Sequence, residues 1–306
     1  MQNSQFFFSI LSAVILFLFG LSSFSTELKT SAGPKLQEII NLITKNRITS
    51  FLSGTILTAV IQSSAAVTSL TVSLIDSGLL SFKSAMAIIL GAYIGTSLTA
   101  WIVSLQIPGI GPIFIVLGTV ISLLPFKIQV LGKALFFFGF IFFSLDLVSS
   151  SLSPLKESKE LAHLLLQTGN PFMGFLVGIA LTVILQSSTV VTGLTIIFVQ
   201  QGLIMPENSI AIVIGANLGT TGTALFASIK MGLTARKAAL SNTIINAIGA
   251  IIIFIFLKPF TSFVITNTPN MSMVVAFAHL SFNILLTSIF MIFLTPFVNL
   301  MDQIID

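Results

Sequence analysis

Long apolar runs follow one another along the 306-residue chain. They lie at residues 5–25, 51–75, 84–106, 110–126, 130–152, 172–200, 209–229, 238–257 and 272–298. About 20 helical residues cross the roughly 30 Å of bilayer hydrocarbon, and every run approaches or exceeds that length, with 110–126 among the shortest. The pattern predicts an all-α, polytopic membrane protein. No basic residue precedes the first run, so we expect it to be a retained transmembrane helix and not a signal peptide.

Composition agrees with a membrane protein and removes several classes of function. Hydrophobic residues make up 55% and charged residues 7%, against about 25% charged in a soluble domain. The chain has no cysteine, which removes disulfides and thiol chemistry. It has no basic stripe with interleaved aromatic residues, so we expect membrane lipid and not nucleic acid as a partner. We expect no cofactor and no enzyme activity, because the sequence has no nucleophile–base pair or metal-ligand cluster.

A polar tripeptide occurs in the middle of two apolar runs, as Gln62-Ser63-Ser64 and again as Gln186-Ser187-Ser188. Residues 51–100 align without a gap on residues 175–224. A further match, Leu16-Phe17-x-Phe19-Gly20 with Leu135-Phe136-x-Phe138-Gly139, extends the copy back to the first run. The sequence therefore predicts an internal duplication, with repeat 1 at residues 1–130, and with repeat 2 and a C-terminal helix (272–298) at residues 131–306.

How the two polar-centred runs cross the bilayer decides the symmetry of the repeats. The 12 residues from Phe51 to Gln62 span about 18 Å as a helix, so each half of the run reaches only to mid-bilayer. Each run is therefore either one full helix or a re-entrant hairpin, over about 51–76 and 172–200, and length alone does not choose between them. If both are hairpins, each repeat has three crossings and the second is inverted, as in many secondary transporters.

The distribution of basic residues predicts the orientation. With hairpins, residues 27–50, 76–83, 127–133 and 229–237 share one side and carry ten of the 13 Lys and Arg. That side should be cytoplasmic, which gives an external N-terminus, seven full crossings and a cytoplasmic C-terminus. The orientation is the same without hairpins, so the charge count does not test them. Two amphipathic stretches, within 28–49 and 155–168, are expected to lie in the membrane interface.

Polar groups at bilayer depth must find hydrogen-bond partners, because an unsatisfied group in hydrocarbon costs several kcal/mol. A single Ser or Thr would be read as contact between helices. Here hydroxyl residues and a Gln cluster twice, and each cluster precedes a Gly- and Thr-rich block, at 91–99 and at 215–223. We expect these blocks to interrupt their helices and free backbone groups for ions. Close helix packing is the alternative, which we prefer for Gly54 and Gly178.

Charged residues are absent from 51–75, 84–106, 172–200 and 209–229. A proton-driven pump usually needs an intramembrane carboxylate or a His relay. A neutral nest of hydroxyls, carboxamides and carbonyls suits hard alkali cations, and it can hold an anion if cations and helix N-termini supply the opposing charge. The residues alone therefore predict a Na⁺-coupled transporter of a small anion.

The doubled motifs resemble the type II sodium–phosphate cotransporter family, in its bacterial branch. That family has two Gln-Ser-Ser-Ser elements, each followed by a Gly-Ala-Asn-Ile-Gly-Thr-[Ser/Thr] block. Ala278-His279-Leu280-Ser281-Phe282-Asn283 is similar to the family's Ala-His-x-x-Phe-Asn, and segment 236–249 is a weaker copy of that element. The resemblance implies Na⁺-driven phosphate import across a bacterial plasma membrane by alternating access, and it favours hairpins. It also implies that phosphate and Na⁺ share one set of ligands: Gln62, Ser63, Ser64, Thr68, Thr96, Ser97, Thr99, Gln186, Ser187, Ser188, Thr189, Thr192, Asn217, Thr220, Thr221 and Thr223.

Three departures from the family pattern bear on function. Ala65 replaces the third Ser of the first element, and Thr189 takes that place in the second. Tyr93 replaces the Asn of the first block, so we expect less typical chemistry in repeat 1. The chain ends at Asp306, where many bacterial members continue into a regulatory domain, so a separate cytoplasmic regulator stays open as a partner, as does a homodimer. A phosphate exporter, a carrier of another oxyanion and a non-transporting phosphate sensor are the alternative functions.

Overall fold

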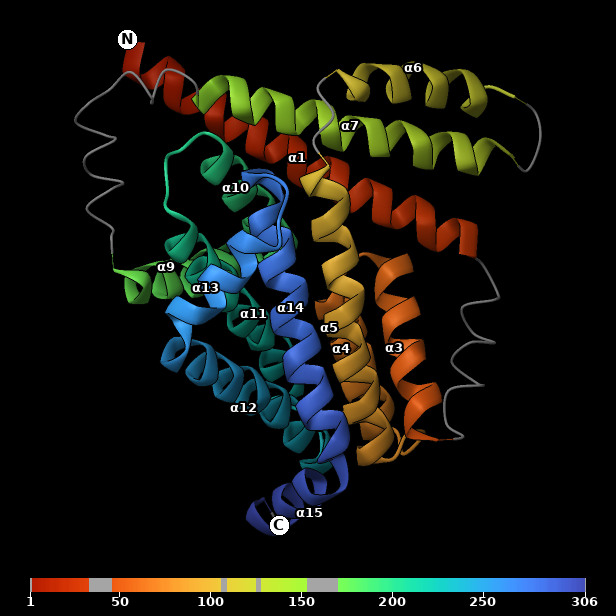
Figure 1. The fold of residues 1–306 in the computed structure, drawn as a ribbon. Coiled ribbons are helices and arrows are strands. Elements are labelled where there is room, and N and C mark those ends of the chain that lie inside the picture. Colours follow the sequence, from red (N-terminus) through yellow and green to blue (C-terminus); the bar gives the residue numbers. More distant parts are fainter. Residues whose placement is uncertain (1, 33–45, 106–108, 125–127, 153–169, 306) are drawn as a thin grey trace.

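The computed structural model describes residues 2–32, 46–105, 109–124, 128–152 and 170–305 (Figure 1). These residues form helices and short connections, with no strand among them, which confirms the all-α prediction. The helices are α1 (Gln2–Ala32), α3 (Arg47–Ile61), α4 (Ser64–Asp76), α5 (Phe82–Ser104), α6 (Ile110–Ser122), α7 (Ile128–Leu152), α9 (Pro171–Leu185), α10 (Ser188–Gln200), α11 (Pro206–Ser228), α12 (Leu233–Ile255), α13 (Leu257–Thr266), α14 (Met271–Ile292) and α15 (Leu294–Ile304). The amphipathic stretch expected within 28–49 lies largely outside the described residues, and 155–168 lies entirely outside them.

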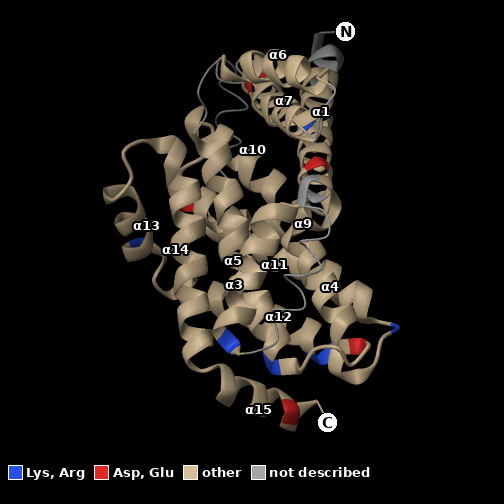
Figure 2. Cartoon of the chain, turned by 90° about the vertical axis from the view of Figure 1, so that its right-hand side faces the viewer, with Lys and Arg blue, Asp and Glu red and all other residues tan. Residues whose placement is uncertain are grey.

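Six of the described helices are long and apolar enough to cross a membrane: α1, α5, α7, α11, α12 and α14. They coincide with six of the seven full crossings expected from the sequence. The seventh, 110–126, forms a helix of only 13 residues in α6, about 20 Å long. Lys and Arg gather mainly at the end of the molecule where α15 lies, and the middle is largely uncharged (Figure 2).

In each repeat the chain reverses direction at the polar tripeptide. Helix α3 packs along α5, and three contacts run in the same order along both helices: Gly54 with Ile88, Thr58 with Gly95, and Gln62 with Thr99. The two helices are therefore parallel. Because α4 connects to α5 through a turn of a few residues, α4 runs against both. In repeat 2, Gly178 meets Ile212 and Thr182 meets Gly219, so α9 and α11 pack in the same way.

The Gly- and Thr-rich blocks do not interrupt their helices, so that prediction is wrong. Helices α5 and α11 are continuous from Phe82 to Ser104 and from Pro206 to Ser228. The glycines instead allow backbones to touch. A Cβ atom on Gly91 would lie 1.9 Å from the carbonyl oxygen of Phe51, and one on Gly215 would lie 2.1 Å from that of Phe175. Close packing, the alternative preferred for Gly54 and Gly178 alone, therefore accounts for the blocks as well.

Helices α12 and α14 are each followed by a short helix after a break. The expected C-terminal helix over 272–298 ends at Ile292, and α15 starts two residues later. Pro296 explains this end, since its ring would clash with the carbonyl of residue 292 in a continuing helix. Pro259 ends α12 at Ile255 in the same way. The sequences at the two breaks, Phe256-Leu257-Lys258-Pro259-Phe260 and Phe293-Leu294-Thr295-Pro296-Phe297, show that α12–α13 and α14–α15 are a further pair of copies.

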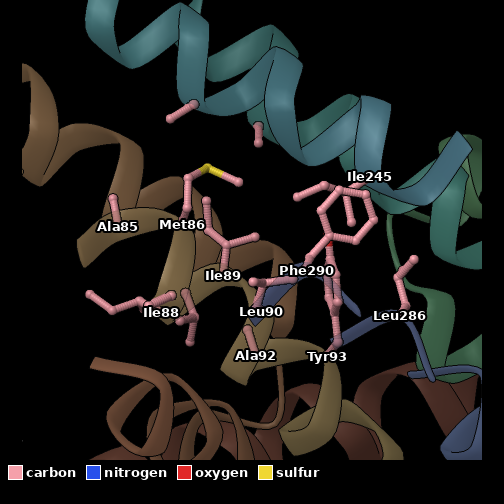
Figure 3. Packing of buried hydrophobic residues seen from close by; sticks show 14 of the residues in the cluster. Ala85, Met86, Ile88, Ile89, Leu90, Ala92, Tyr93, Ile245, Leu286 and Phe290 are labelled. Carbon is pink, nitrogen blue, oxygen red and sulfur yellow. The ribbon is translucent and has the colours of Figure 1, made fainter. Parts of the chain in front are cut away.

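The core lies around α5, whose buried side chains from Ala85 to Tyr93 pack with Ile245 of α12 and with Leu286 and Phe290 of α14 (Figure 3). At the end of the molecule that holds α15, Asp76 Oδ1 accepts a hydrogen bond from the backbone N–H of Gly232 at 2.6 Å. The turn after α4 and the connection before α12 therefore lie at the same end. Lys237 of α12 pairs with Asp302 of α15 at 2.9 Å, which fixes α15 there.

Candidate functional site

Each polar tripeptide lies where one helix ends and the next begins, and the two breaks have nearly the same backbone. Gln62 has φ 58° and ψ 25°, and Gln186 has φ 52° and ψ 26°. Ser63 and Ser187 are both extended, with φ −151°. We call residues 62–64 the first tip and residues 186–188 the second tip. Each motif therefore divides its apolar run into two helices at an equivalent position.

The two Gln residues have the only positive φ angles of non-glycine residues in the described chain. A left-handed backbone costs a residue with a side chain about 1–2 kcal/mol, and helices usually place Gly at such a position. Strain of this kind persists where the surrounding structure enforces it, and it is frequent at functional sites. Gln at both tips therefore indicates that a carboxamide is needed there.

Each tip also presents the N-terminus of a helix. Ser63 Oγ accepts a hydrogen bond from Ala66 N–H at 3.2 Å, and Ser187 Oγ accepts one from Val190 N–H at 3.4 Å. The N–H groups of a first turn have no acceptor within their own helix, and the helix dipole adds partial positive charge there. Both tips can therefore bind an anion through backbone N–H groups.

A small polar cavity, which we call the central cavity, is lined by both repeats and by α12 and α14. Its volume is about 20 Å³, which is room for about one water-sized particle. Its lining is made of hydroxyl, phenol and carboxamide side chains: Ser64, Thr68, Tyr93, Thr96, Ser188, Asn217, Thr220, Thr221, Asn242, Asn246 and Asn283.

On the repeat 1 side of the central cavity, the phenol of Tyr93 bridges two amides of α12. Its hydroxyl donates to Asn242 Oδ1 and accepts from Asn246 Nδ2 at 2.7 Å. These amides are four residues apart, on one face of α12. Tyr93 thereby connects α5 to α12 in the position where the second block has Asn217.

On the repeat 2 side, Asn217 bridges two side chains of α14 that are also four residues apart. Asn217 Nδ2 donates to Asn283 Oδ1 at 3.0 Å, and Asn217 Oδ1 lies 2.9 Å from His279 Nε2. Because this oxygen can only accept, the ring proton is assigned to Nε2. Asn283 Nδ2 in turn donates to the Tyr93 carbonyl at 3.0 Å and to Ser97 Oγ at 2.9 Å. The network of α14 thus joins the two repeats.

A larger pocket, which we call the tip pocket, lies between the two tips and α1. Its volume is about 310 Å³. Its apolar lining is Leu and Val, and its polar lining is Ser22, Ser25, Gln62, Ser63, Gln186 and Ser187. Gln186 also lines a neighbouring pocket of about 250 Å³, together with Thr223.

The side chains that line these three pockets are all uncharged. Among the described residues, no group of three or more His, Cys, Asp and Glu could hold a metal ion. Hydroxyl, carboxamide and carbonyl oxygens are the ligands that remain, and they suit a hard monovalent cation better than a transition metal.

A sequence model of one protein family, described as Na+/Pi-cotransporter, matches residues 16–150 and again residues 144–289. The two matches together cover most of the chain. The chain belongs to this family. Its membrane helices and family membership together make it a multi-pass membrane protein. The double match places one copy of the family pattern on each half of the chain.

Relatives within the Na+/Pi-cotransporter family differ in length and in name. "Uncharacterized protein YqeW" of Bacillus subtilis is 27% identical over 97% of this chain and 96% of its own length. "Putative inorganic phosphate export protein YjbB" of Salmonella typhimurium is 26% identical over 96% of this chain, which spans 54% of that protein. "Sodium-dependent phosphate transport protein 2A" of Ovis aries is 37% identical over 33% of this chain and 16% of that protein. No solved structure matches the chain.

The sixteen residues expected to bind ions lie in three places. Seven line the central cavity: Ser64, Thr68, Thr96, Ser188, Asn217, Thr220 and Thr221. Four line the tip pocket: Gln62, Ser63, Gln186 and Ser187. Five lie outside both linings: Ser97 bonds to Asn283, Thr99 bonds to Gln62 Oε1 at 2.7 Å, Thr223 lies beside Gln186, and Thr189 and Thr192 are buried. The structure thus places eleven of the sixteen residues in two separate compartments and five outside both.

Three amides and a phenol at the site were not among the expected ligands. Tyr93 was singled out only as a departure from the family pattern, and Asn242, Asn246 and Asn283 only as motif residues. The signal that could have found them is the shared spacing of four residues in α12 and α14, opposite residues 93 and 217. His279 of α14 bonds to Asn217 of the neighbouring helix α11, which agrees with the expectation that this residue pairs with another helix and is not a proton relay.

Proposed function

We propose that this chain is a secondary active transporter that imports inorganic phosphate together with Na⁺, by alternating access around a site between the two tips. The observation that carries the proposal is the pair of matched tips. Two left-handed Gln residues and two Ser N-caps, far apart in sequence, border the same tip pocket. Family membership supports phosphate and Na⁺ as the transported ions.

The neutral lining of the site supports coupling to Na⁺. A phosphate ion carries one or two negative charges into a site that contains no Lys, Arg or Asp among its lining residues. Helix N-termini supply only partial charge. A cation bound at the same time cancels most of the anion's charge and removes most of the cost of burying it. The sixteen expected ligands, eleven of which line the two compartments, are proposed to hold both ions.

We propose further that α3–α4 and α9–α10 are re-entrant hairpins in two inverted repeats, 1–130 and 131–306, in a bacterial inner membrane with the N-terminus outside. The reversal of the chain at each tip supports the hairpins. With α6 counted as a crossing, the contact between Asp76 and Gly232 supports them too, because full-length helices in their place would put the two connections on opposite sides. Single cysteines at Ser77 and Gln201, the C-caps of α4 and α10, test the inversion. An impermeant thiol reagent should label them from opposite sides, and labelling from one side would contradict it.

The function is tested by uptake of radiolabelled phosphate into proteoliposomes, with Na⁺, K⁺ and pH gradients imposed separately. We expect uptake that needs an inward Na⁺ gradient and that falls with Gln186→Ala. Uptake that follows the pH gradient and ignores Na⁺ would overturn the coupling.

Export of phosphate is the second candidate, and the relatives named YjbB favour it. Import and export use the same site, so the test is net flux in vesicles of known orientation with physiological gradients. Competition by unlabelled arsenate and sulfate tests whether another oxyanion is the substrate. Bound phosphate with no flux under any gradient would assign the chain to a sensor instead.

A further inference from the structure

The tip pocket has a third wall, formed by α1, that was not part of the expected site. Ser22 and Ser25 of α1 face the pocket together with the polar side chains of both tips. The two serines lie three residues apart and so on one face of the helix. Their roles differ, because one hydroxyl is bonded to a tip and the other is free.

Ser25 acts on the electrostatics of the first tip. Its Oγ donates a hydrogen bond to the carbonyl of Ile61, the last residue of α3. Carbonyls at the end of a helix have no partner in the helix and carry partial negative charge, which repels anions. The carbonyls of Thr58 and Ala59 accept from the backbone N–H and the Nε2 of Gln62. Three of the last four carbonyls of α3 are thus covered, and the N–H groups at the start of α4 dominate the tip.

Ser22 supplies a free donor. It is exposed, and its hydroxyl makes no hydrogen bond within the described part of the chain. The carboxamide of Gln186 across the pocket is likewise exposed and likewise without a hydrogen bond there. An anion between them could accept from a hydroxyl, an amide and the backbone N–H groups of two helices, which are the groups that bind oxyanions in proteins.

The sizes of the two compartments decide where the anion lies in this conformation. The central cavity, at about 20 Å³, holds about one water-sized particle, which is less than a tetrahedral oxyanion with its four oxygens. The tip pocket, at about 310 Å³, lies within the range of small-ligand sites. The anion therefore fits the tip pocket and not the central cavity.

Helix α7, the copy of α1, does not repeat the arrangement. Ser144, which aligns with Ser25, donates to the carbonyl of Phe140 in its own helix at 2.7 Å. The third wall of the tip pocket is therefore made by α1 and has no counterpart from α7 in its lining.

We propose that the tip pocket is a binding site for a tetrahedral oxyanion in which Ser22 is a direct ligand and Ser25 is a positioning residue that covers the Ile61 carbonyl. The identity of the oxyanion as phosphate rests on the proposed function. The site itself rests on the pocket and on α1.

The absence of native cysteine allows a direct test of the site. Ser22→Cys is treated in detergent with methyl methanethiosulfonate, in Na⁺ buffer with or without phosphate, and labelling is followed by intact mass. With phosphate at about ten times its dissociation constant, a ligand that covers the thiol slows labelling about tenfold. Ser23→Cys, at the same depth but outside the pocket lining, is the matched control and should be unaffected. No slowing at residue 22, or equal slowing at residue 23, would overturn the proposal.

Measurements of phosphate uptake distinguish the direct ligand, Ser22, from the positioning residue, Ser25. Ser22→Ala should raise the KM for phosphate about tenfold, as expected for one hydrogen bond to a charged group, and Ser22→Thr should restore it. Ser23→Ala should leave the KM unchanged. Ser25→Ala should raise the KM because it exposes the Ile61 carbonyl, and it should also release α1 from the tip, seen as faster labelling of Ser22→Cys in the double variant. An unchanged KM in Ser22→Ala would contradict the role of Ser22.

The proposed transport function and the proposed binding site in the tip pocket can be contradicted independently of each other. If wild-type proteoliposomes take up no phosphate under any gradient but phosphate still protects residue 22, the transport function falls and the binding site stands. If Na⁺-dependent uptake is present and residue 22 is unprotected, the site falls and the function stands.

Discussion

The two tips have the same sequence and the same backbone but different surroundings. At the first tip, Gln62 is 9% exposed, its Oε1 accepts from Thr99, and its Nε2 donates to Ala59. At the second, Gln186 is exposed and its carboxamide is free within the described residues. Thr223, the copy of Thr99, bonds instead to the Thr220 carbonyl at 2.8 Å.

The difference shows that the duplication preserves the backbone of the tips but not the hydrogen bonds of their side chains. The tripeptide and the close helix packing set the backbone of each tip, so the φ angles agree within a few degrees. The side chains respond to their neighbours, and α1 covers the first tip through Ser25, whereas Ser144 of α7 bonds within its own helix. In this conformation the second tip offers its carboxamide to a ligand, and the first tip must break bonds to do so. Four sets of substitutions test this difference, beginning with the set expected to lower stability most.

The close packing of α3 on α5 and of α9 on α11 should be disturbed to the same extent by the same substitution. A Cβ atom on Gly54 or Gly178 would lie 2.0 Å from the carbonyl oxygen of Ile88 or Ile212. We expect Gly54→Ala and Gly178→Ala each to cost about 3 kcal/mol, the upper part of the usual range for overpacking, measured as thermal stability in detergent. Gly222→Ala is the control, since its Cβ would meet nothing closer than Phe226 at 3.9 Å. A large loss in one repeat only would show that the two packings are not equivalent.

The link between the repeats depends on Asn283. Its amide contacts Asn217, the Tyr93 carbonyl and Ser97, all at 2.9–3.0 Å. Asn283→Ala leaves buried polar groups unpaired, which costs about 1–3 kcal/mol, and it should also lower phosphate uptake because Asn217 loses its orientation. Asn267→Ala, which removes one exposed bond to Phe263, should change neither stability nor uptake. Normal uptake in Asn283→Ala would mean that the network is not needed for transport.

The two tip carboxamides should differ in stability but not in function. Gln62→Ala removes two internal hydrogen bonds and should cost about 1 kcal/mol, whereas Gln186→Ala removes none within the described chain and should leave the melting temperature unchanged. Both should reduce Na⁺-driven phosphate uptake, because both carboxamides line the tip pocket. Equal losses of stability would remove the distinction between an engaged and a free tip.

The smallest difference in stability is expected between variants of Thr99 and Thr223, whose hydroxyls lie next to the two tips. Thr99→Val should lower stability by about 0.5–1 kcal/mol, since it removes the bond to Gln62. Thr223→Val removes only a bond within α11 and should be close to neutral. Thermal unfolding of the two variants beside wild type measures the difference, and a reversed order would place the engaged carboxamide in the second tip.

Much of this arrangement could be predicted from the sequence, because the duplication is read directly from Gln62 and Gln186 and apolar length locates six crossing helices. The role of the glycine blocks could not, since Gly91 and Gly215 are as compatible with a broken helix as with touching backbones. Only the position of the Phe51 and Phe175 carbonyls decides between these. The amides of α12 escaped notice because Asn242 matches His279 of the other copy, so the pair shares spacing but not residue type.

The division of the expected ligands between two compartments, and the contribution of α1, also lay beyond the sequence. Ser22 and Ser25 lie in an apolar helix, where a lone hydroxyl is ordinarily a contact between helices. Their meaning depends on which helix lies across the first tip, and the chain order does not reveal this.

A site between the two tips that needs Na⁺ to bind phosphate is tested by phosphate binding to the purified protein with and without Na⁺, in wild type and in the Gln62→Ala/Gln186→Ala double variant. We expect wild type to bind radiolabelled phosphate in Na⁺ and not in K⁺, and we expect the double variant, shown to be folded by its melting curve, to bind none. Full phosphate binding by the double variant, or binding that is equally strong without Na⁺, would contradict such a site.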